Sequence, residues 1–172
     1  AEILWTQGAG ESQQAVLARS ADIGLVGTLG AFATFAKGAP VRIIAAEATG
    51  AADFWYVKAD SAIRSMSDAG GRTIGYSTNG ASTHIMVLGF LKQAGVTTAK
   101  PIATGGPAST LTQVMSGQVD IGWSAPPFGI TQLNDKQIRV VAYGSDLAAI
   151  RDQTVRVWIT MADKLDARPA VF

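Results

Sequence analysis

The fold of this chain is decided by residues 21–47, whose sequence is ADIGLVGTLGAFATFAKGAPVRIIAAE. Two short apolar runs, residues 22–26 and 41–46, have the length of buried strands. Between them residues 31–37 have the composition of a helix, which Gly38 ends as glycine commonly does. We therefore predict a strand–helix–strand unit, the building block of an α/β fold.

The flanking segments repeat this alternation of strands and helices. Upstream, we predict a strand at residues 3–6 and a helix at residues 11–19. Downstream, we predict strands at residues 54–58, 73–76, 100–103, 121–124 and 138–143, and helices at residues 61–69, 82–94 and 109–116. Strands that alternate with helices favour parallel α/β sheets.

The chain is expected to form two lobes rather than one domain. Residues 47–53 are small and polar, which suits a crossing between lobes. We assign residues 1–50 to part of lobe one, residues 51–157 to lobe two, and residues 158–172 to a segment that returns towards lobe one.

A short repeated sequence relates the two halves of the chain. Ala21-Asp22-Ile23-Gly24 and Val119-Asp120-Ile121-Gly122 each follow a predicted helix and open a predicted strand. Chance recurrence of Asp-Ile-Gly at a helix-to-strand turn is the simpler explanation, and a shared construction of the two halves is the alternative.

Composition excludes several classes of function. The 172 residues are 48% hydrophobic, which allows a buried core, and 14 Lys and Arg nearly balance 13 Asp and Glu. Such a balance does not favour nucleic acid or anionic lipid as a partner. The absence of cysteine removes disulfides and thiolate chemistry. The apolar runs are far shorter than the ~20 residues that cross a bilayer, and we expect any signal peptide to lie outside this chain.

The motifs that suggest catalysis or cofactor binding are incomplete. Gly8-Ala9-Gly10 lacks the third glycine of a dinucleotide turn, because Gln13 stands there, and Gly105-Gly106-Pro107 lacks the lysine of a P-loop. The single histidine, His84, is two residues from Ser82, a spacing that separates side chains on a helix. One histidine and scattered carboxylates show no metal-ligand spacing. We predict no catalytic residue, no metal and no cofactor.

The segment whose composition most strongly suggests a binding site is the turn Asn79-Gly80-Ala81-Ser82-Thr83. It joins a predicted strand to the longest predicted helix, so that hydroxyls and backbone N–H groups lie at a helix N-terminus, where anions and carbonyl dipoles bind well. An ordinary helix N-cap explains the turn equally well. Trp123 and the loop after it lie at the carboxyl end of another predicted strand, where open α/β sheets bind ligands.

Taken together, these segments resemble a known family, the type II periplasmic binding proteins of the nitrate, taurine and aliphatic-sulfonate group, including relatives similar to thiamine-pyrimidine binders. The resemblance rests on matching segments in the expected order: residues 21–27, 37–41, 63–68, 71–75, 80–83, 117–120 and 123–126. It covers most of the chain.

The resemblance implies a periplasmic protein of two α/β lobes, the first of them incomplete. These lobes would close over a small polar or anionic molecule and deliver it to an ABC permease in the inner membrane, with no covalent chemistry. The ligand contacts that it implies, together with Asn79 and Trp123 from the patterns above, are Gly27, Thr28, Glu47, Asn79, Gly80, Ala81, Ser82, Thr83, Trp123, Ser124 and Pro126.

Two departures from the family qualify this interpretation. Family chains are longer, with an opening strand and helix and closing helices on lobe one, so we expect uncovered apolar surface there and self-association of the chain. No arginine falls in the implied cleft segments, because Arg42, Arg72 and Arg139 all lie at strand starts. The ligand therefore stays open among sulfonates, nitrate, pyrimidines and aromatic acids.

Two alternative functions remain. One is a pyrimidine-synthase-like enzyme, although the cysteine-rich segment of such enzymes is absent. The other is the effector-binding domain of a transcriptional regulator, although no helix-turn-helix pattern is present.

Overall fold

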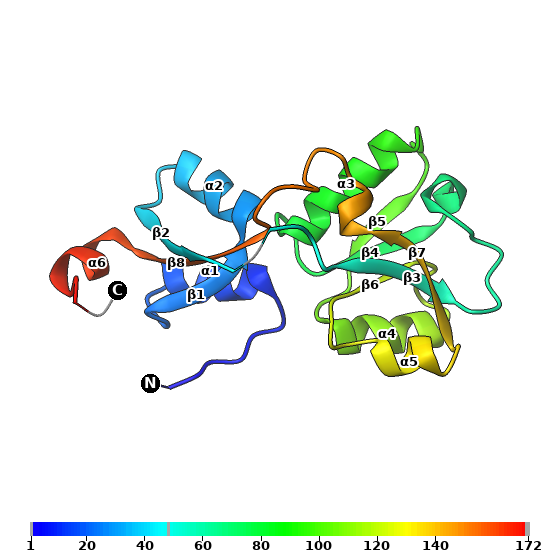
Figure 1. Ribbon diagram of the computed structural model, residues 1–172, viewed down its shortest axis with the longest axis horizontal. Helices are drawn as coiled ribbons and strands as arrows, with labels where there is room; N and C mark the ends of the chain where they lie inside the picture. The colour runs from blue at the N-terminus through cyan, green and yellow to red at the C-terminus, as the bar shows by residue number, and fades with distance from the viewer. Residues whose placement is uncertain (1, 48, 171–172) are drawn as a thin grey trace.

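Figure 1 shows two α/β lobes joined by two crossing segments. The computed structural model describes residues 2–47 and 49–170. Lobe one contains α1 (Ala9–Leu17), β1 (Ile23–Gly27), α2 (Thr28–Ala36), β2 (Val41–Ala46), β8 (Arg156–Met161) and α6 (Ala162–Ala167). Lobe two contains β3 (Phe54–Lys58), the 3-10 helix η1 (Met66–Ala69), β4 (Thr73–Tyr76), α3 (Ser82–Gln93), β5 (Lys100–Ala103), α4 (Pro107–Met115), β6 (Gly122–Ser124), α5 (Ile130–Asn134), β7 (Ile138–Tyr143) and η2 (Gly144–Asp146).

The strands of lobe two lie in the order β5-β4-β6-β3-β7. Strands β4 and β5 pair in parallel, and a parallel bridge from Ile74 to Ile121 joins β4 to the start of β6. Strand β3 runs antiparallel to both β6 and β7. The prediction of parallel sheets is therefore wrong for β3, because the chain enters from lobe one at the edge where the other four strands end.

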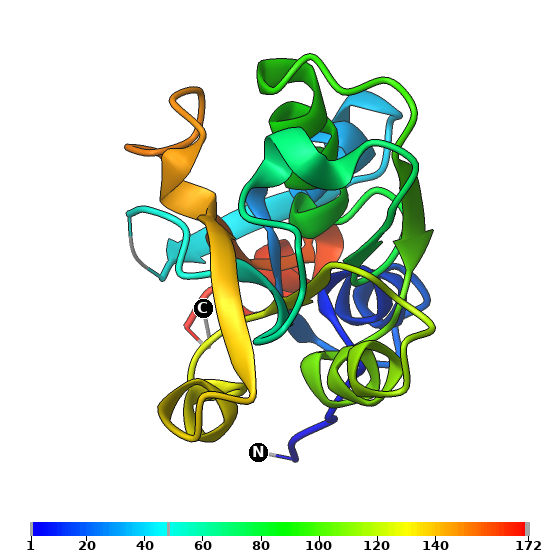
Figure 2. The ribbon, with the colours of Figure 1, turned by 90° about the vertical axis from the view of Figure 1, so that its right-hand side faces the viewer.

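Two apolar cores cover the two faces of this sheet. Successive residues of β3 alternate between them, as side chains of a strand must: Phe54 and Tyr56 pack with α4 and α5, whereas Trp55 and Val57 pack with α3. Figure 2 shows α3 on one side of the strands and α4 and α5 on the other. Both faces of the sheet in lobe two are thus covered.

Lobe one has a three-stranded sheet in the order β1-β8-β2. Strand β8 runs antiparallel to both neighbours, so the parallel prediction is wrong here too. The connection through α2 leaves β1 and β2 parallel to each other but one strand apart, and β8 fills the gap as the chain returns from lobe two.

Only one face of this sheet carries an apolar core among the described residues. Val157, Ile159 and Met161 of β8 pack with Val16 of α1 and Ala31 of α2. The intervening Trp158 points to the opposite face and is 40% exposed. Lobe one therefore leaves apolar area in contact with water.

Two further predictions of secondary structure are wrong. Residues 3–6 form no strand, and Ile3, Leu4 and Trp5 are exposed, because no described strand pairs with them. The helix predicted at residues 61–69 is reduced to η1, because the Asp68 carboxylate accepts hydrogen bonds from the N–H groups of Arg64 and Ser65 and so caps the helix there. Strands β2, β3, β4, β5 and β7 have the predicted bounds, and the other predicted strands and helices are present with shifted ends. Strand β8 and helices α5, α6 and η2 were not predicted.

Candidate functional site

The two crossing segments, residues 47–53 and 147–155, run beside each other between the lobes. The Glu47 N–H donates to the Arg156 carbonyl at 3.2 Å, and the Gly50 N–H donates to the Gln153 carbonyl at 2.9 Å. These backbone hydrogen bonds tie the two connections between the lobes to each other. Ala48, the neighbour of the predicted contact Glu47, lies outside the described residues.

The lobes touch where β1 ends and α3 begins. A Cβ atom added to Gly27 would lie 1.9 Å from the Ser82 hydroxyl oxygen, and one added to Gly30 would lie 3.4 Å from the Gly80 carbonyl oxygen. Contacts under 3.0 Å are sterically impossible without a shift, so Gly27 is the residue that allows this approach. The structure thus brings the predicted residues Gly27, Gly80 and Ser82 together across the lobe boundary.

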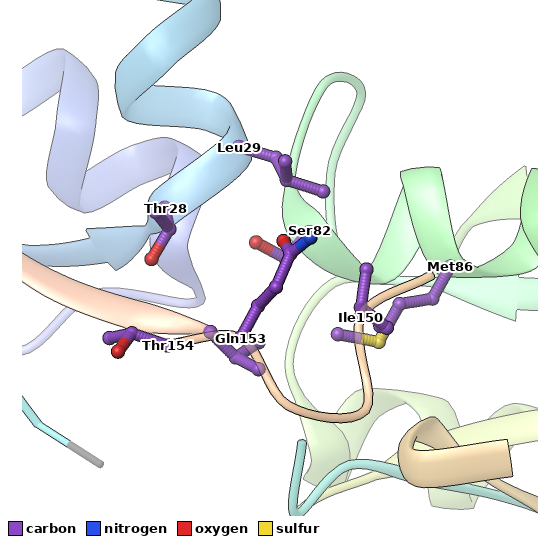
Figure 3. A pocket seen from close by; sticks show the side chains of 8 residues that line it. Thr28, Leu29, Ser82, Met86, Ile150, Gln153 and Thr154 are labelled. Carbon is purple, nitrogen blue, oxygen red and sulfur yellow. The ribbon is translucent and has the colours of Figure 1, made fainter. Parts of the chain in front are cut away.

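Beside this contact lies a small pocket, which we call the junction pocket (Figure 3). Its lining residues come from α2, α3 and the second crossing segment, and are Thr28, Leu29, Ser82, Met86, Ile150, Gln153, Thr154 and Val155. The free volume is about 10 Å³, which accommodates about one water molecule. An organic ligand therefore needs the lobes to separate before it can enter.

Two hydroxyl groups in the junction pocket lack a hydrogen-bond partner among the described residues. Thr28 Oγ1 and Ser82 Oγ are both buried and unpaired, although buried polar atoms are nearly always satisfied. Thr28 is the first residue of α2 and Ser82 is the first residue of α3, and neither helix has a side-chain cap. Both residues line the junction pocket, and each stands at the positive end of a helix, an arrangement that suits an electronegative group.

The remaining residues of the predicted turn are held by internal contacts. Thr83 Oγ1 accepts a hydrogen bond from the Ser77 N–H at 3.0 Å and lies 2.7 Å from the Ser77 hydroxyl, so its hydroxyl is already paired. Ala81 is buried at the N-cap of α3. Gly80 has φ +78°, a conformation that favours glycine. Asn79 is exposed and accepts a hydrogen bond from the Tyr76 hydroxyl.

A wider groove of about 370 Å³ lies on the first crossing segment; we call it the junction groove. It contains the predicted residue Glu47 together with Asp53, Ser145 and Arg156. The Arg156 guanidinium lies 3.7 Å from a Glu47 carboxylate oxygen and 3.5 Å from an Asp53 carboxylate oxygen. Burial raises the pKa of the Asp53 carboxyl above its ordinary value, although the charge of Arg156 acts in the opposite direction.

The last three predicted residues lie in neither cavity. The Trp123 indole N–H donates to the Gly105 carbonyl at 3.2 Å, and the Ser124 hydroxyl donates to the Phe128 carbonyl at 3.0 Å. Pro126 is exposed on the loop that follows. These contacts give Trp123 and Ser124 structural roles in lobe two.

Sequence reasoning missed the contribution of the second crossing segment. Gln153 and Thr154 line the junction pocket, and Gln153 extends from that segment towards α3 (Figure 3). Arg156, the first residue of β8 directly after that segment, places a guanidinium in the junction groove, whereas no cleft arginine was predicted. The only signal in the sequence was a polar run, residues 151–154, before an apolar strand.

Some kinds of site are absent from the part of the chain that the structure describes. No group of three or more His, Cys, Asp or Glu side chains within residues 2–47 and 49–170 is arranged to hold a metal ion. Over the same residues, no helix has the length and apolar character needed to cross a bilayer.

Comparison with known proteins relates this geometry to a family and a fold. The sequence model of the NMT1/THI5-like family matches residues 1–171. No curated protein matches the chain. Many solved structures do, and those described below are under 25% identical, so they establish the fold alone.

The alkanesulfonate-binding protein SsuA from Xanthomonas axonopodis pv. citri, bound to MOPS, is 23% identical, and the match covers 96% of this chain and 56% of that one with a TM-score of 0.83. The periplasmic aliphatic sulphonate binding protein SsuA from Escherichia coli has the same identity and coverage with a TM-score of 0.73. PhnD1 from Prochlorococcus marinus, in complex with methylphosphonate, is 17% identical, and the match covers 95% of this chain and 64% of that one with a TM-score of 0.70. The fold is therefore the predicted two-lobed α/β fold of periplasmic binding proteins, and the chain spans little more than half the length of the SsuA proteins.

Proposed function

The chain belongs to the NMT1/THI5-like family, and from this premise we propose that it captures a small anionic or polar organic molecule between its two lobes, as the solute-binding component of an ABC importer in the periplasm. The proposal involves no covalent chemistry, and its partner is a permease in the inner membrane. The similar structures are binding proteins whose names refer to sulfonates and phosphonates. They favour solute capture over the synthase-like enzyme and the regulator domain.

The observation that carries the proposal is the pair of unpaired hydroxyls in the junction pocket. A buried hydroxyl without a partner loses the hydrogen bonds that water gave it in the unfolded chain, at a cost of ~1–3 kcal/mol. Thr28 Oγ1 and Ser82 Oγ both incur this cost, and they belong to different lobes. A ligand oxygen that accepts from both would offset the cost and draw the lobes together.

The charge of the ligand follows from the same geometry. The N-termini of α2 and α3 both lie at the pocket, and helix N-termini favour negative charge. No acidic side chain is among the described residues that line the junction pocket. A sulfonate, phosphonate or carboxylate group is the class of ligand that we infer, with its apolar part towards Leu29, Met86 and Ile150.

Calorimetry of the intact protein against a panel of sulfonates, phosphonates, nitrate and pyrimidines tests the proposal. We expect a bound anion that is released unchanged, and Ser82→Ala should weaken it by roughly ten- to a hundredfold, because a hydrogen bond to a charged group contributes ~1.5–3 kcal/mol. The control is Ser67→Ala, an exposed serine of η1 remote from the pocket. Conversion of the ligand to a product, or unchanged affinity in a folded Ser82→Ala variant, would reject the proposal.

A further inference from the structure

The single histidine of the chain holds the turn that separates β4 from α3. The Gly80 N–H donates to His84 Nδ1 at 3.1 Å. An imidazole nitrogen accepts a hydrogen bond only when it carries no proton, so the proton of neutral His84 is on Nε2. This bond therefore exists only in the neutral form of the side chain.

A ring contact fixes the orientation of His84. Its imidazole stacks on the Tyr76 ring with centroids 4.2 Å apart and an interplanar angle of 16°. The Tyr76 hydroxyl donates to Asn79 Oδ1 at 2.6 Å, so the same tyrosine also holds the other side of the turn. Together, Tyr76 and His84 hold residues 79 and 80 from both sides; we call this arrangement the Tyr76–His84 clamp.

The clamped turn lies against lobe one. The Gly80 carbonyl oxygen faces Gly30 of α2, and Ser82 two residues later contacts Gly27 at the end of β1. A displacement of Gly80 would therefore move the segment that carries the unpaired Ser82 hydroxyl.

Protonation of His84 acts against the clamp in two ways. A proton on Nδ1 would face the Gly80 N–H, which removes the hydrogen bond and sets two donors against each other. His84 is also the third residue of α3, where the helix dipole disfavours positive charge. A cationic imidazole is attracted to the face of the Tyr76 ring. This attraction keeps the imidazole stacked on Tyr76, but it does not restore an acceptor on His84 for the Gly80 N–H.

Few other ionisable groups lie close enough to substitute for this histidine. The elements packed most extensively on α3 are α2, η1, β4 and β5. Helix α2 has no ionisable side chain and β4 has only Tyr76, which belongs to the clamp. The Asp68 carboxylate of η1 already accepts hydrogen bonds from the Arg64 and Ser65 N–H groups. Lys100 lies opposite Thr73, at the end of β5 that is far from the Gly80 turn. Asp146, beyond β7, is near the other end of α3, where its carbonyl accepts from Gln93.

We propose that His84 is a positioning residue, whose neutral imidazole holds the Gly80 turn in its binding geometry and whose protonation releases the turn and weakens ligand binding in acid. This inference rests on the proposed function for the effect on binding. The effect on the turn itself does not depend on any ligand.

The experiment compares two variants with the unmodified protein at about pH 8 and about pH 5.5, on either side of the ordinary range for histidine. His84→Asn keeps an acceptor oxygen near the position of Nδ1 but does not titrate in this range. His84→Phe keeps a ring to stack on Tyr76 but has no acceptor. The first readout is the protection factor of the Gly80 amide without ligand, which is its exchange rate relative to that of an unstructured peptide at the same pH. The second is calorimetric binding of butanesulfonate, which stays ionised throughout.

In the unmodified protein, we expect a lower protection factor of the Gly80 amide and roughly two- to tenfold weaker binding at the lower pH, because one ordinary hydrogen bond is lost. His84→Asn should show neither change, and His84→Phe should have a low protection factor of the Gly80 amide at both pH values. A Gly80 protection factor that is the same at both pH values, or an Asn variant that keeps the original pH profile, overturns the proposal. If butanesulfonate does not bind at either pH, the proposed function fails for that probe, while the amide still decides the role of His84. If the Phe variant does not fold, the Asn variant and the unmodified protein suffice.

Discussion

Two stretches with the same three residues, Asp22-Ile23-Gly24 in lobe one and Asp120-Ile121-Gly122 in lobe two, show how much of the structure is local. Each stretch follows a helix, α1 or α4, and leads into or opens a strand, β1 or β6. A Cβ atom added to Gly24 would lie 2.7 Å from Val16 Cγ2, and one added to Gly122 would lie 2.6 Å from Val114 Cγ2. In both lobes, a helix valine packs directly on the strand glycine, so the sequence echo reflects one packing motif used twice.

The surroundings of the two stretches differ. Ile121 is completely buried, because the strand it leads into lies between β4 and β3, whereas Ile23 is 39% exposed on the edge strand β1. Asp120 accepts hydrogen bonds at 2.8 Å from the N–H and the hydroxyl of Thr73. Asp22 pairs instead with the side chain of Lys164 at the surface. The same local motif thus acquires different stability from the strands around it.

Truncation of the two isoleucines should give the largest difference between the lobes. We expect Ile121→Ala to lower the free energy of unfolding by ~2–5 kcal/mol, because it opens a cavity in a closed core. Ile23→Ala should cost less than about 1 kcal/mol, since that side chain gives up little buried area. Urea denaturation followed by tryptophan fluorescence measures both. Equal losses would mean that β1 is as well covered as β6.

This contrast shows which parts of the fold could be predicted from the sequence and which could not. The helix-to-strand turns, the two lobes and most elements follow from local apolar patterns, which act over a few residues. The order of strands does not, because β8 is inserted between β1 and β2 from the far end of the chain. The exposure of residues 3–6 likewise depends on the absence of a described neighbouring strand, which a local pattern cannot show.

The uncovered face of lobe one gives the second prediction. Trp158 lies opposite Leu25 on one neighbouring strand and Ala45 on the other, and it is 40% exposed. We expect the chain to associate with increasing concentration, and Trp158→Ser to weaken association by roughly ten- to a hundredfold, since burying such a side chain contributes ~1.5–3 kcal/mol. Light scattering over a concentration series measures this effect.

The control for this prediction is Phe128→Ser in lobe two, which removes another exposed aromatic ring from a lobe whose sheet is covered. Its association should match that of the unmodified chain. A protein that stays monomeric over the whole concentration range would show that the open face of lobe one does not drive association.

The glycine–valine contacts test whether the shared motif contributes equally in both lobes. Gly122→Ala and Gly24→Ala should each cost ~1–3 kcal/mol by overpacking. The cost should be higher at Gly122, where Tyr56 Cζ and Thr110 Cγ2 also lie within 3.0 Å of an added Cβ atom.

Double mutants sharpen the test of these contacts. Val114→Ala should recover part of the loss in Gly122→Ala, and Val16→Ala should do the same for Gly24→Ala, because each removes the clashing methyl group. Thermal melts of the two double-mutant cycles measure the coupling. If neither valine substitution restores stability, the clash lies with other neighbours and the motif is not shared.

The candidate site was less accessible to sequence reasoning than the fold. Ser82 was identifiable because it lies between a predicted strand and a predicted helix, a local signal, whereas Gly27 and Thr28 were implied only by the family resemblance. Gln153 was not, because it reaches the junction pocket only after the chain has completed lobe two. The structural hydrogen bond of Trp123 to Gly105 is a long-range contact that strand-end position alone could not reveal.

The smallest effect should come from Asp22, one of the two aspartates of the motif. Asp120→Ala should cost ~1–3 kcal/mol, because it leaves the partly buried N–H and hydroxyl of Thr73 with one acceptor fewer. Asp22→Ala should cost less than Asp120→Ala, and only at low salt. Its partners Lys164 and Arg168 act through surface ion pairs that salt screens. Lys164 lowers the pKa of the Asp22 carboxyl, so the stabilisation is present at neutral pH, where the carboxyl is ionised, and is lost as pH falls through that lowered pKa. The difference in unfolding free energy between the unmodified protein and Asp22→Ala, measured against pH and salt, should therefore vanish in acid and at high salt. A difference that persists under both conditions would mean that Asp22 stabilises its lobe through hydrogen bonds rather than charge.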